Sequence, residues 1–323
     1  MKAVVVERYG PPDVLQLKEV EKPVPKDNEI LVRIRATTVN SGDARVRALR
    51  VPRGFRLLTR LRLGLFGPRQ PVLGFELAGE IEAVGGSVTK YRPGDRVIGS
   101  AGFAFGCHAE YKCLPDDAAV ALIPDALSFE DAVSFCFGGV TALYFFRRGS
   151  LKRGENVLIN GASGAVGTMA VQLAKHFGAE VTGVCSTANL DLVRSLGADH
   201  VIDYTNEDFS RNRVTYDVIM DNVGNAPFSR ARASLKSGGR FLMVIGNLPQ
   251  LIRASFQRQV VGAAADDAEV ITAEIYRFLL DLAVAGEIRP VIDRTYPLER
   301  ISDAHAYVDT ARKRGSVVIT VGN

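Results

Sequence analysis

Apolar and polar positions follow two different periods along this chain, and the change of period divides it into regions. Up to about residue 120, short apolar runs are separated by turn-forming Gly, Pro, Asp and Asn, which is typical of a β-rich unit. From residue 129 to about residue 250, helical spacing alternates with short apolar runs, which predicts a doubly wound parallel sheet. The last third begins with a helical pattern over residues 268–285 and ends in two further strand-like runs.

These patterns predict an α/β fold with two domains, one of them discontinuous. The 323 residues exceed what a single average core holds, which supports the division. We expect residues 1–120 to form the first part of a catalytic domain and residues 121–258 to form a nucleotide-binding domain. Residues 259–323 are expected to return to the first domain.

Residues 155–204 are interpreted as a nucleotide site, element by element. A strand-like run ends at Ile159, a glycine-rich turn spans Gly161–Gly167, a helical pattern follows, and a second strand-like run begins at Glu180. Such a unit presents unpaired backbone N–H groups and a positive helix end to a pyrophosphate. A glycine triplet alone is weak evidence, whereas a complete βαβ context is strong; a turn without any ligand is the alternative. The turn residues predicted to bind the cofactor are Ser163, Gly164, Ala165 and Val166.

Composition and charge favour an ordinary globular protein. The net charge of +4 is too small to indicate nucleic acid as the main partner, and no apolar stretch reaches the roughly 20 residues that span a bilayer. The first residues lack the regions of a signal peptide, so a cytoplasmic location is expected. The cysteines form no Cys-x-x-Cys pair and are expected to be reduced and mostly buried: Cys107, Cys113, Cys136 and Cys185.

Several motifs occur in an order that identifies a family. They are Gly74–Gly79 (GFELAG), Pro93–Val97 (PGDRV), the turn Gly161–Gly167, and Leu196–Asp199 followed by Val201–Tyr204. Over nearly its whole length the chain resembles the medium-chain dehydrogenase/reductase superfamily, in its zinc-free quinone oxidoreductase-like branch. The resemblance implies a GroES-like catalytic domain, a Rossmann domain and an active site in the cleft between them. It also implies a homodimer formed through an edge strand near Phe241–Ile245.

No metal site is predicted. By the resemblance, zinc-dependent relatives place a cysteine near the start of the cleft and a histidine in a Gly-His-Glu motif, where this chain has Asn40 and Phe75. A phenyl ring offers no lone pair, and a neutral amide is a poor substitute for a thiolate. The cysteine cluster of a structural zinc lobe is also missing.

The predicted cofactor is NADPH. An acidic residue at the end of the second strand would bind the ribose 2′-hydroxyl of NADH, but none follows Cys185 here. Instead Ser186, Thr187 and Asn189 can donate hydrogen bonds to a 2′-phosphate, and the resemblance places Tyr204 against the same phosphate. No strong cation stands at positions 188 and 189. Arg194 is a candidate for that role, and a solvated helix face is the alternative interpretation for it.

Two further strand ends are expected beside the nicotinamide, because cofactors lie at the carboxyl ends of parallel strands. The resemblance assigns a cofactor role to Asn222 and Val223 after one strand and to Ile245 after another, and it places Thr141 at a helix start nearby. Simple turn chemistry is the alternative for these segments.

Asn40 and Asp43 are the candidate catalytic residues, since the resemblance places both on the floor of the cleft. Asn40 would hydrogen-bond the nicotinamide or the substrate carbonyl. For Asp43, holding a loop or pairing with an arginine is the favoured alternative. His108 is expected to be structural rather than catalytic. Without zinc the acceptor must already be activated, which favours a small-molecule quinone or α,β-unsaturated carbonyl.

Repeated arginines, interleaved with leucines and without an acid, occupy residues 45–69. A lid over the substrate entrance is the favoured interpretation, and contact with a membrane or a polyanion is the alternative. The sequence also leaves two other functions open. One is a zinc-free alcohol or aldehyde dehydrogenase. The other is a non-catalytic NADPH-binding redox-sensing module that uses the arginines to bind RNA.

Overall fold

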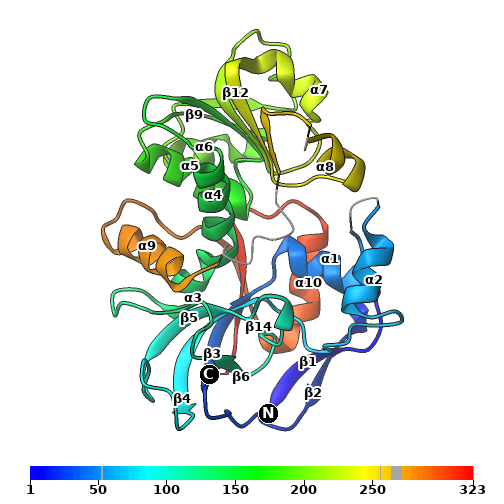
Figure 1. Ribbon diagram of the computed structural model, residues 1–323, viewed down its shortest axis with the longest axis vertical. Helices are drawn as coiled ribbons and strands as arrows, with labels where there is room; N and C mark the ends of the chain where they lie inside the picture. Colours follow the sequence, from blue (N-terminus) through cyan, green and yellow to red (C-terminus); the bar gives the residue numbers. More distant parts are fainter. Residues whose placement is uncertain (52–53, 255, 263–270, 323) are drawn as a thin grey trace. The chain divides into compact units, whose positions relative to one another are not determined.

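The computed structural model describes residues 1–51, 54–254, 256–262 and 271–322, and these residues form two compact units (Figure 1). Unit 1 comprises Met1–Val51, Phe55–Phe137 and Ile271–Asn323, and unit 2 comprises Pro52–Gly54 and Gly138–Val270. The boundaries expected from the sequence, after residues 120 and 258, come earlier than these and remain a prediction of where the domains divide.

Unit 2 is built on a six-stranded sheet whose strands are all parallel. The strands lie in the order β10-β9-β8-β11-β12-β13. Their bounds are Asn156–Asn160 (β8), Glu180–Cys185 (β9), His200–Asp203 (β10), Tyr216–Asp221 (β11), Leu235–Met243 (β12) and Val260–Gly262 (β13). This arrangement confirms the predicted doubly wound Rossmann sheet.

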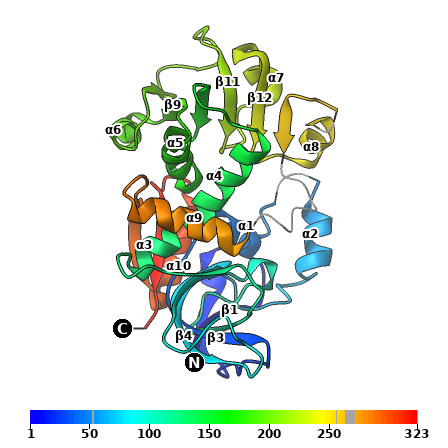
Figure 2. The same ribbon diagram turned by 60° about the vertical axis from the view of Figure 1, so that its left-hand side comes forward.

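Helix α4 precedes the first strand of unit 2, and four further helices connect its successive strands and lie beside them in both views (Figures 1 and 2). Their bounds are Cys136–Arg148 (α4), Ala165–His176 (α5), Leu190–Ser195 (α6), Phe228–Ala231 (α7) and Leu248–Ala254 (α8). Right-handed crossovers put α5 and α6 on one face of the sheet and α7 and α8 on the other. The strand order therefore reverses between β8 and β11, and the carboxyl ends of these two strands form the switch point where such sheets bind ligands.

Unit 1 is β-rich, as the short apolar runs predict. Its larger sheet has the order β14-β15-β3-β4-β5-β7, with β6 also paired to β3, and β1 pairs with β2 in a hairpin-like sheet. The strands are Lys2–Val6 (β1), Leu15–Glu19 (β2), Glu29–Thr38 (β3), Glu76–Val84 (β4), Arg96–Ser100 (β5), Tyr111–Pro115 (β6), Val120–Leu122 (β7), Ile292–Pro297 (β14) and Ser316–Thr320 (β15). Because β15 pairs with β3, the end of the chain completes the sheet that its beginning starts.

Five helices belong to unit 1 within the described residues. They are Ser41–Ala48 (α1), Arg56–Leu63 (α2), Phe129–Ser134 (α3), Ala273–Val284 (α9) and Ile301–Asp309 (α10). One apolar core, with Ile34, Leu77 and Ile319 among its residues, joins the first and last segments. Helix α2 is unusual, because none of its residues is buried.

The prediction that the strand near Phe241–Ile245 lies at the edge of the sheet is wrong. Phe241–Met243 of β12 pairs with Val260–Gly262 of β13, so another strand covers this position. The short β13 carries only three residues, and the sequence pattern gave no strand there. Homodimerisation remains a prediction. In the part of the chain that the structure describes, no helix has the length and apolar character needed to cross a bilayer.

Candidate functional site

The glycine-rich turn of unit 2 leaves the N-terminus of α5 open to a ligand. Gly161 has a φ of +80°, and a Cβ on Gly167 would come within 2.1 Å of the Gly161 carbonyl oxygen. Gly164 is the N-cap of α5, and no side chain caps this 12-residue helix. A Cβ on Gly164 would meet no atom closer than 3.8 Å. The turn is therefore tight on its inner side and open at Gly164, which suits a pyrophosphate held by the free N–H groups of the first helical turn.

Asp221 fixes the second loop of the switch point. It is the last residue of β11 and the register partner of Asn160 at the end of β8. Its carboxylate accepts hydrogen bonds from Asn160 Nδ2 at 2.8 Å and from the backbone N–H groups of Val223, Gly224 and Ala226 at 3.1, 3.0 and 3.3 Å. One buried carboxylate thus shapes the loop after β11. The sequence analysis did not single Asp221 out, although its place before the predicted Asn222 was the available signal.

Asn222 fits the role predicted for it. Both polar atoms of its side-chain amide, Nδ2 and Oδ1, are buried without a hydrogen-bond partner. A buried amide that makes no hydrogen bond costs free energy, so this position suits a ligand that offers both a donor and an acceptor. The ribose hydroxyls and the carboxamide of a nicotinamide nucleotide supply such groups.

The two loops and the end of β12 come together at Val223 and Ile245, whose cofactor roles stay predictions. A Cβ on Gly161 would lie 2.6 Å from Val223 Cγ2, and a Cβ on Gly224 would lie 3.2 Å from Ile245 Cγ2. Gly161 and Gly224 also have φ angles of +80° and +81°, a conformation that favours glycine at both positions. The predicted pyrophosphate turn and the predicted nicotinamide segments therefore share one edge of the sheet.

Thr141 lies on α4, on the side that approaches the same edge. A Cβ on Gly138 would come within 2.2 Å of the Ala165 carbonyl oxygen, so α4 and the first turn of α5 are in backbone contact. Thr141 follows Gly138 by three residues and shares its helix face. The predicted cofactor role of Thr141 agrees with this position.

The residues predicted to face a 2′-phosphate converge at the end of β9. Asn189 Nδ2 donates to Ser163 Oγ at 3.1 Å and to Ser186 Oγ at 3.2 Å. These three side chains form one polar cluster beside the glycine turn. Tyr204 follows β10 and is mostly exposed, with its backbone N–H donating to Cys185.

Thr187 and Arg194 already have partners. The Thr187 hydroxyl donates to Asp203 Oδ2 at 2.5 Å, and this donation lowers the pKa of the Asp203 carboxyl. Arg194 forms an ion pair with Asp191 at 2.9 Å on the solvent side of α6. Asp203, which no sequence pattern indicated, places a negative charge next to the predicted phosphate residues.

In unit 1, Asn40 and Asp43 form a reciprocal cap at the start of α1. Asn40 Oδ1 accepts from the N–H groups of Gly42 and Asp43, and Asp43 Oδ2 accepts from the Asn40 N–H at 2.9 Å. Asp43 is fully buried, and loss of hydration raises the pKa of its carboxyl to about 7. These contacts show that Asp43 helps to hold the start of α1, which is a structural role. Its catalytic role stays a prediction. The Asn40 Nδ2 group has no hydrogen bond of ordinary geometry and is available as a donor.

Glu76 is a buried acid that the sequence analysis quoted only as part of a motif. Its carboxylate accepts from the Thr38 hydroxyl at 2.7 Å. Burial raises the pKa of Glu76 to about 8, and the neighbouring charge of Asp43 acts in the same direction. The Asn40 amide also acts on Glu76, and its hydrogen-bonding interaction lowers that pKa. Glu76 is therefore mostly protonated near neutral pH.

Two histidines lie in contact inside the same unit. His108 Nε2 is 3.0 Å from the Thr38 carbonyl oxygen, which only accepts, so the proton is on Nε2 and Nδ1 is left without a partner. Its ring meets that of His305 edge-on, with centroids 5.7 Å apart. Burial lowers the pKa of His108 to about 4 and that of His305 well below its ordinary value. A histidine that stays neutral and buried supports the structural role expected for His108.

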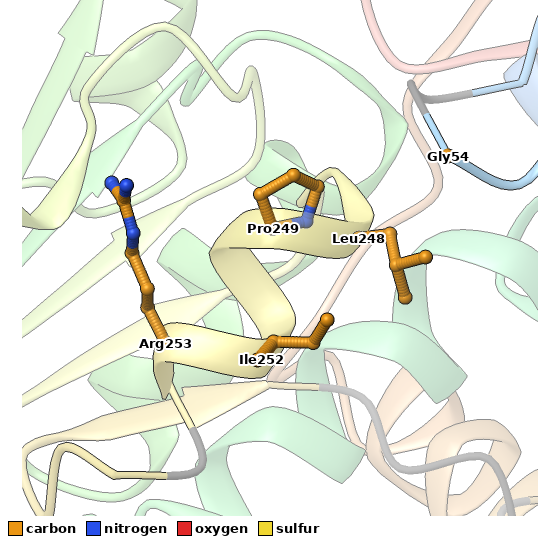
Figure 3. A pocket seen from close by; sticks show the side chains of 5 residues that line it. All are labelled: Gly54, Leu248, Pro249, Ile252 and Arg253. Carbon is orange, nitrogen blue, oxygen red and sulfur yellow. The ribbon is translucent and has the colours of Figure 1, made fainter.

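Two hollows in unit 2 differ in their relation to these residues. The first, of about 360 Å³, lies beside α8 and is lined by Gly54, Leu248, Pro249, Ile252 and Arg253; Figure 3 shows Arg253 extending away from Leu248. It contains none of the predicted site residues. The second, of about 250 Å³, includes Asp221, Gly224 and Ile245 at the strand ends and extends to Phe228 and Arg232. Only the second therefore belongs to the candidate site.

Comparison with known proteins agrees with this geometry. Residues 26–125 match the family described as alcohol dehydrogenase GroES-like domain, and residues 196–319 match the one described as zinc-binding dehydrogenase. The first match confirms the GroES-like character predicted for unit 1.

Three proteins illustrate the similarity along the whole chain. A 2-methylene-furan-3-one reductase of Solanum lycopersicum is 32% identical, over 99% of this chain and 79% of the relative. The structure of the quinone oxidoreductase from Coxiella burnetii has a TM-score of 0.88 at 30% identity, covering 100% of this chain and 99% of the other. The Escherichia coli quinone oxidoreductase, solved in complex with NADPH, has a TM-score of 0.84 at 26% identity, covering 99% and 100%.

The family description of residues 196–319 names zinc, but the side chains at the two expected ligand positions, Asn40 and Phe75, do not fit a zinc ion. Asn40 Oδ1 is committed to the cap of α1, and the Phe75 ring packs against Phe105 with centroids 4.8 Å apart. Glu76 accepts a hydrogen bond from the Thr38 hydroxyl. Among the described residues no three His, Cys, Asp or Glu side chains are grouped so as to hold a metal ion.

Proposed function

The chain is an oxidoreductase of the medium-chain dehydrogenase/reductase superfamily, in its quinone oxidoreductase branch, and we propose that it uses NADPH, without zinc, to reduce quinones or α,β-unsaturated carbonyl compounds. The observation that carries the proposal is the switch point of unit 2. There an uncapped helix N-terminus, the loop held by Asp221 and the partnerless Asn222 amide lie along one edge. This combination suits a dinucleotide, because it offers N–H groups to phosphates and an amide to a ribose or nicotinamide.

NADPH is proposed over NADH because hydroxyl and amide donors gather at the end of β9. Ser163, Ser186 and Asn189 form one hydrogen-bonded cluster there, in place of the acid that binds a free 2′-hydroxyl. The Asp203 carboxylate would repel a phosphate, and it accepts hydrogen bonds from the Thr187 and Thr205 hydroxyls. The Escherichia coli relative, described as complexed with NADPH, supports the same choice.

Asn40 is proposed to orient and polarise the acceptor. Its Nδ2 group is a donor without a regular partner, and its Oδ1 is fixed by two backbone N–H groups, so the amide cannot turn. Bound NADPH would supply a hydride. Solvent is proposed to supply the proton, since the nearby acids Asp43 and Glu76 are buried. A single amide donor suffices only for an acceptor that delocalises the added charge, which favours quinones and conjugated enones.

An acceptor screen with a metal chelator present tests the proposal. We expect NADPH oxidation with quinones or conjugated enones, unchanged after the chelator, and little reduction of NADP⁺ by simple alcohols. Asn40→Ala should lower kcat/KM for the best acceptor about 100-fold while the Kd for NADPH stays the same. Activity that is lost on chelation and restored by zinc would refute the zinc-free mechanism. NADPH binding without turnover of any acceptor would favour the redox-sensing alternative.

A further inference from the structure

Large apolar side chains are exposed together on α2 and the loop that follows it. They are Leu57, Leu58, Leu61, Leu65 and Phe66, with exposed fractions from 49% to 91%. Isolated exposed leucines are common in soluble proteins, but five large apolar residues within ten positions mark an interaction surface. We call these five residues the α2 surface.

Helix geometry explains why this surface faces outward. Leu57, Leu58 and Leu61 lie within about 100° of one another around the helix axis, so they share one face. Leu63 lies on the opposite side and packs against the core of unit 1. The Tyr9 hydroxyl donates to the Gly64 carbonyl oxygen at 3.0 Å and holds the end of the helix. The inner side is thus anchored, and the apolar face is presented on a fixed support.

Arginines flank the α2 surface without acidic partners. No Asp or Glu occurs between Asp43 and Glu76 in the sequence. The earlier Arg47 and Arg50 both pair with Asp309 and are not available. Four others form no ion pair within the described residues: Arg56, Arg60, Arg62 and Arg69. Arg62 lies over the exposed Phe103 ring at 4.5 Å, which extends the surface by another aromatic side chain.

We propose that the α2 surface docks this chain on a lipid bilayer that carries anionic headgroups. An apolar helix face bordered by arginines is the pattern of helices that lie in the membrane interface, where leucines enter the acyl boundary and guanidinium groups meet lipid phosphates. RNA is a poorer fit, because leucines offer no stacking surface to bases and would stay exposed to water. A closed lid is also a poorer fit, because a lid would bury these leucines against the protein's own surface.

Docking would give the proposed reductase access to acceptors that dissolve in the membrane rather than in water. This consequence rests on the proposed function, whereas the docking itself does not. Lipophilic quinones and enones with long alkyl chains are the class of substrate it implies.

Vesicle flotation with the full chain tests docking without any turnover. We expect binding to vesicles of phosphatidylcholine with phosphatidylglycerol, and much weaker binding to phosphatidylcholine alone or at high salt. Phe66→Ser should weaken binding about tenfold. Phe256→Ser is the matched control, because Phe256 is 85% exposed against 91% for Phe66 but belongs to unit 2. It should leave binding unchanged.

The charge contribution is tested in the same assay. Replacing Arg56 and Arg69 by Gln should weaken binding about 25-fold, at roughly fivefold for each arginine. Arg211→Gln, which removes an arginine whose side chain is 87% exposed in unit 2, should have no such effect. Thermal unfolding should be the same for all variants, since each substitution is at the surface.

Two outcomes would overturn the inference. One is an absence of binding to anionic vesicles. The other is binding that Phe66→Ser and Phe256→Ser weaken equally, which would indicate non-specific attraction. A rise in KM for a water-soluble quinone on Phe66→Ser, with no binding to vesicles, would identify the segment as a lid instead. If wild-type protein floats but reduces no acceptor, the proposed function fails and docking stands.

Discussion

The two units differ in how many ionisable side chains they bury and where these side chains lie. Among the described residues, unit 1 buries five Asp, Glu, Arg or His side chains: Asp43, Arg47, Glu76, His108 and His305. Unit 2 buries one, Asp221, at the carboxyl end of a strand. The parallel sheet of unit 2 thus keeps an apolar interior and places its polar groups at one edge, whereas unit 1 carries ionisable groups through its core.

This difference separates two ways of building a site. In unit 2 the polar atoms of the candidate cofactor site are mostly backbone N–H groups at turns. Glycine positions and one carboxylate therefore determine the geometry of that site. In unit 1 the buried groups must stay neutral or be paired, because an isolated charge in a core is costly. We therefore expect the stability of unit 1 to depend on pH and the function of unit 2 to depend on backbone space.

The largest effect is expected from Glu76→Gln in unit 1. Because the pKa of Glu76 is about 8 in the folded state and near 4.5 when unfolded, the folded state binds more protons between these values. Its contribution to stability is then full below about pH 4.5 and is lost as the pH rises toward 8. The glutamine stays neutral, so the variant should exceed wild type at pH 8 by about 3–5 kcal/mol in free energy of unfolding, and match it near pH 5.

Urea unfolding at pH 5 and pH 8 measures this. Asp43 has the same sign, since its pKa is raised to about 7, while His108 has the opposite sign and loses stability as the pH falls from 6.5 toward 4. Wild type and Glu76→Gln curves that run parallel over this range would contradict a neutral buried acid.

In unit 2 the largest effect is expected at the glycine turn. Gly167→Ala should lower the free energy of unfolding by about 2–4 kcal/mol, because its Cβ would overlap the Gly161 carbonyl. Gly164→Ala is the matched control and should change stability by less than about 1 kcal/mol, since nothing lies within 3.8 Å. Denaturation curves compare the two. Equal losses would show that the turn is not limited by backbone space.

Asp221→Asn should cost less, about 1–3 kcal/mol, and weaken NADPH binding. An amide cannot accept all four of the hydrogen bonds that the carboxylate receives, so the loop of Val223 and Gly224 should loosen. Asp217→Asn on the same strand is the control, since within the described residues Asp217 accepts from Asn156 and Lys236 alone, at the other end of the strand. Titration of NADPH by fluorescence should separate them. The prediction fails if both variants bind NADPH equally well.

Asn222→Ala is expected to have the smallest effect. Its amide has no partner in the part of the chain that the structure describes, so the free energy of unfolding should stay within about 0.5 kcal/mol of wild type. The Kd for NADPH should nevertheless rise about tenfold, because two hydrogen bonds to the cofactor are lost. Calorimetric titration measures the affinity. A destabilised variant with unchanged affinity for NADPH would show that Asn222 stabilises the fold and does not bind the cofactor.

The candidate cofactor site was largely predictable because its parts are local. Each predicted residue follows a strand or starts a helix within one βαβ unit, and parallel strands bring their carboxyl ends to one edge. Asp221 and Asp203 also end strands, but a lone acid at a strand end has no spacing signal, because its role depends on the loop that folds back onto it. The edge position of Phe241–Ile245 was wrong because a three-residue strand is too short to produce a periodic signal.

The polar interior of unit 1 could not be predicted in this way. Glu76 accepts a hydrogen bond from Thr38 of β3, and the charge of Lys313 lowers the pKa of Glu76. Loss of hydration in turn lowers the pKa of Lys313 to about 8. His108 meets His305 from a helix nearly 200 positions later in the chain. No short window contains both members of such a pair, so neither the pairing nor the pKa follows from spacing.

The sequence by itself determined the alternation of strands and helices, the glycine turn and the acid-free arginine segment, since each depends on neighbouring residues and on backbone sterics. Only the tertiary structure decided which acids and histidines are neutral, which amides lack partners and which leucines of α2 face water. These properties depend on burial, and burial is fixed when distant segments pack around a side chain and remove its water.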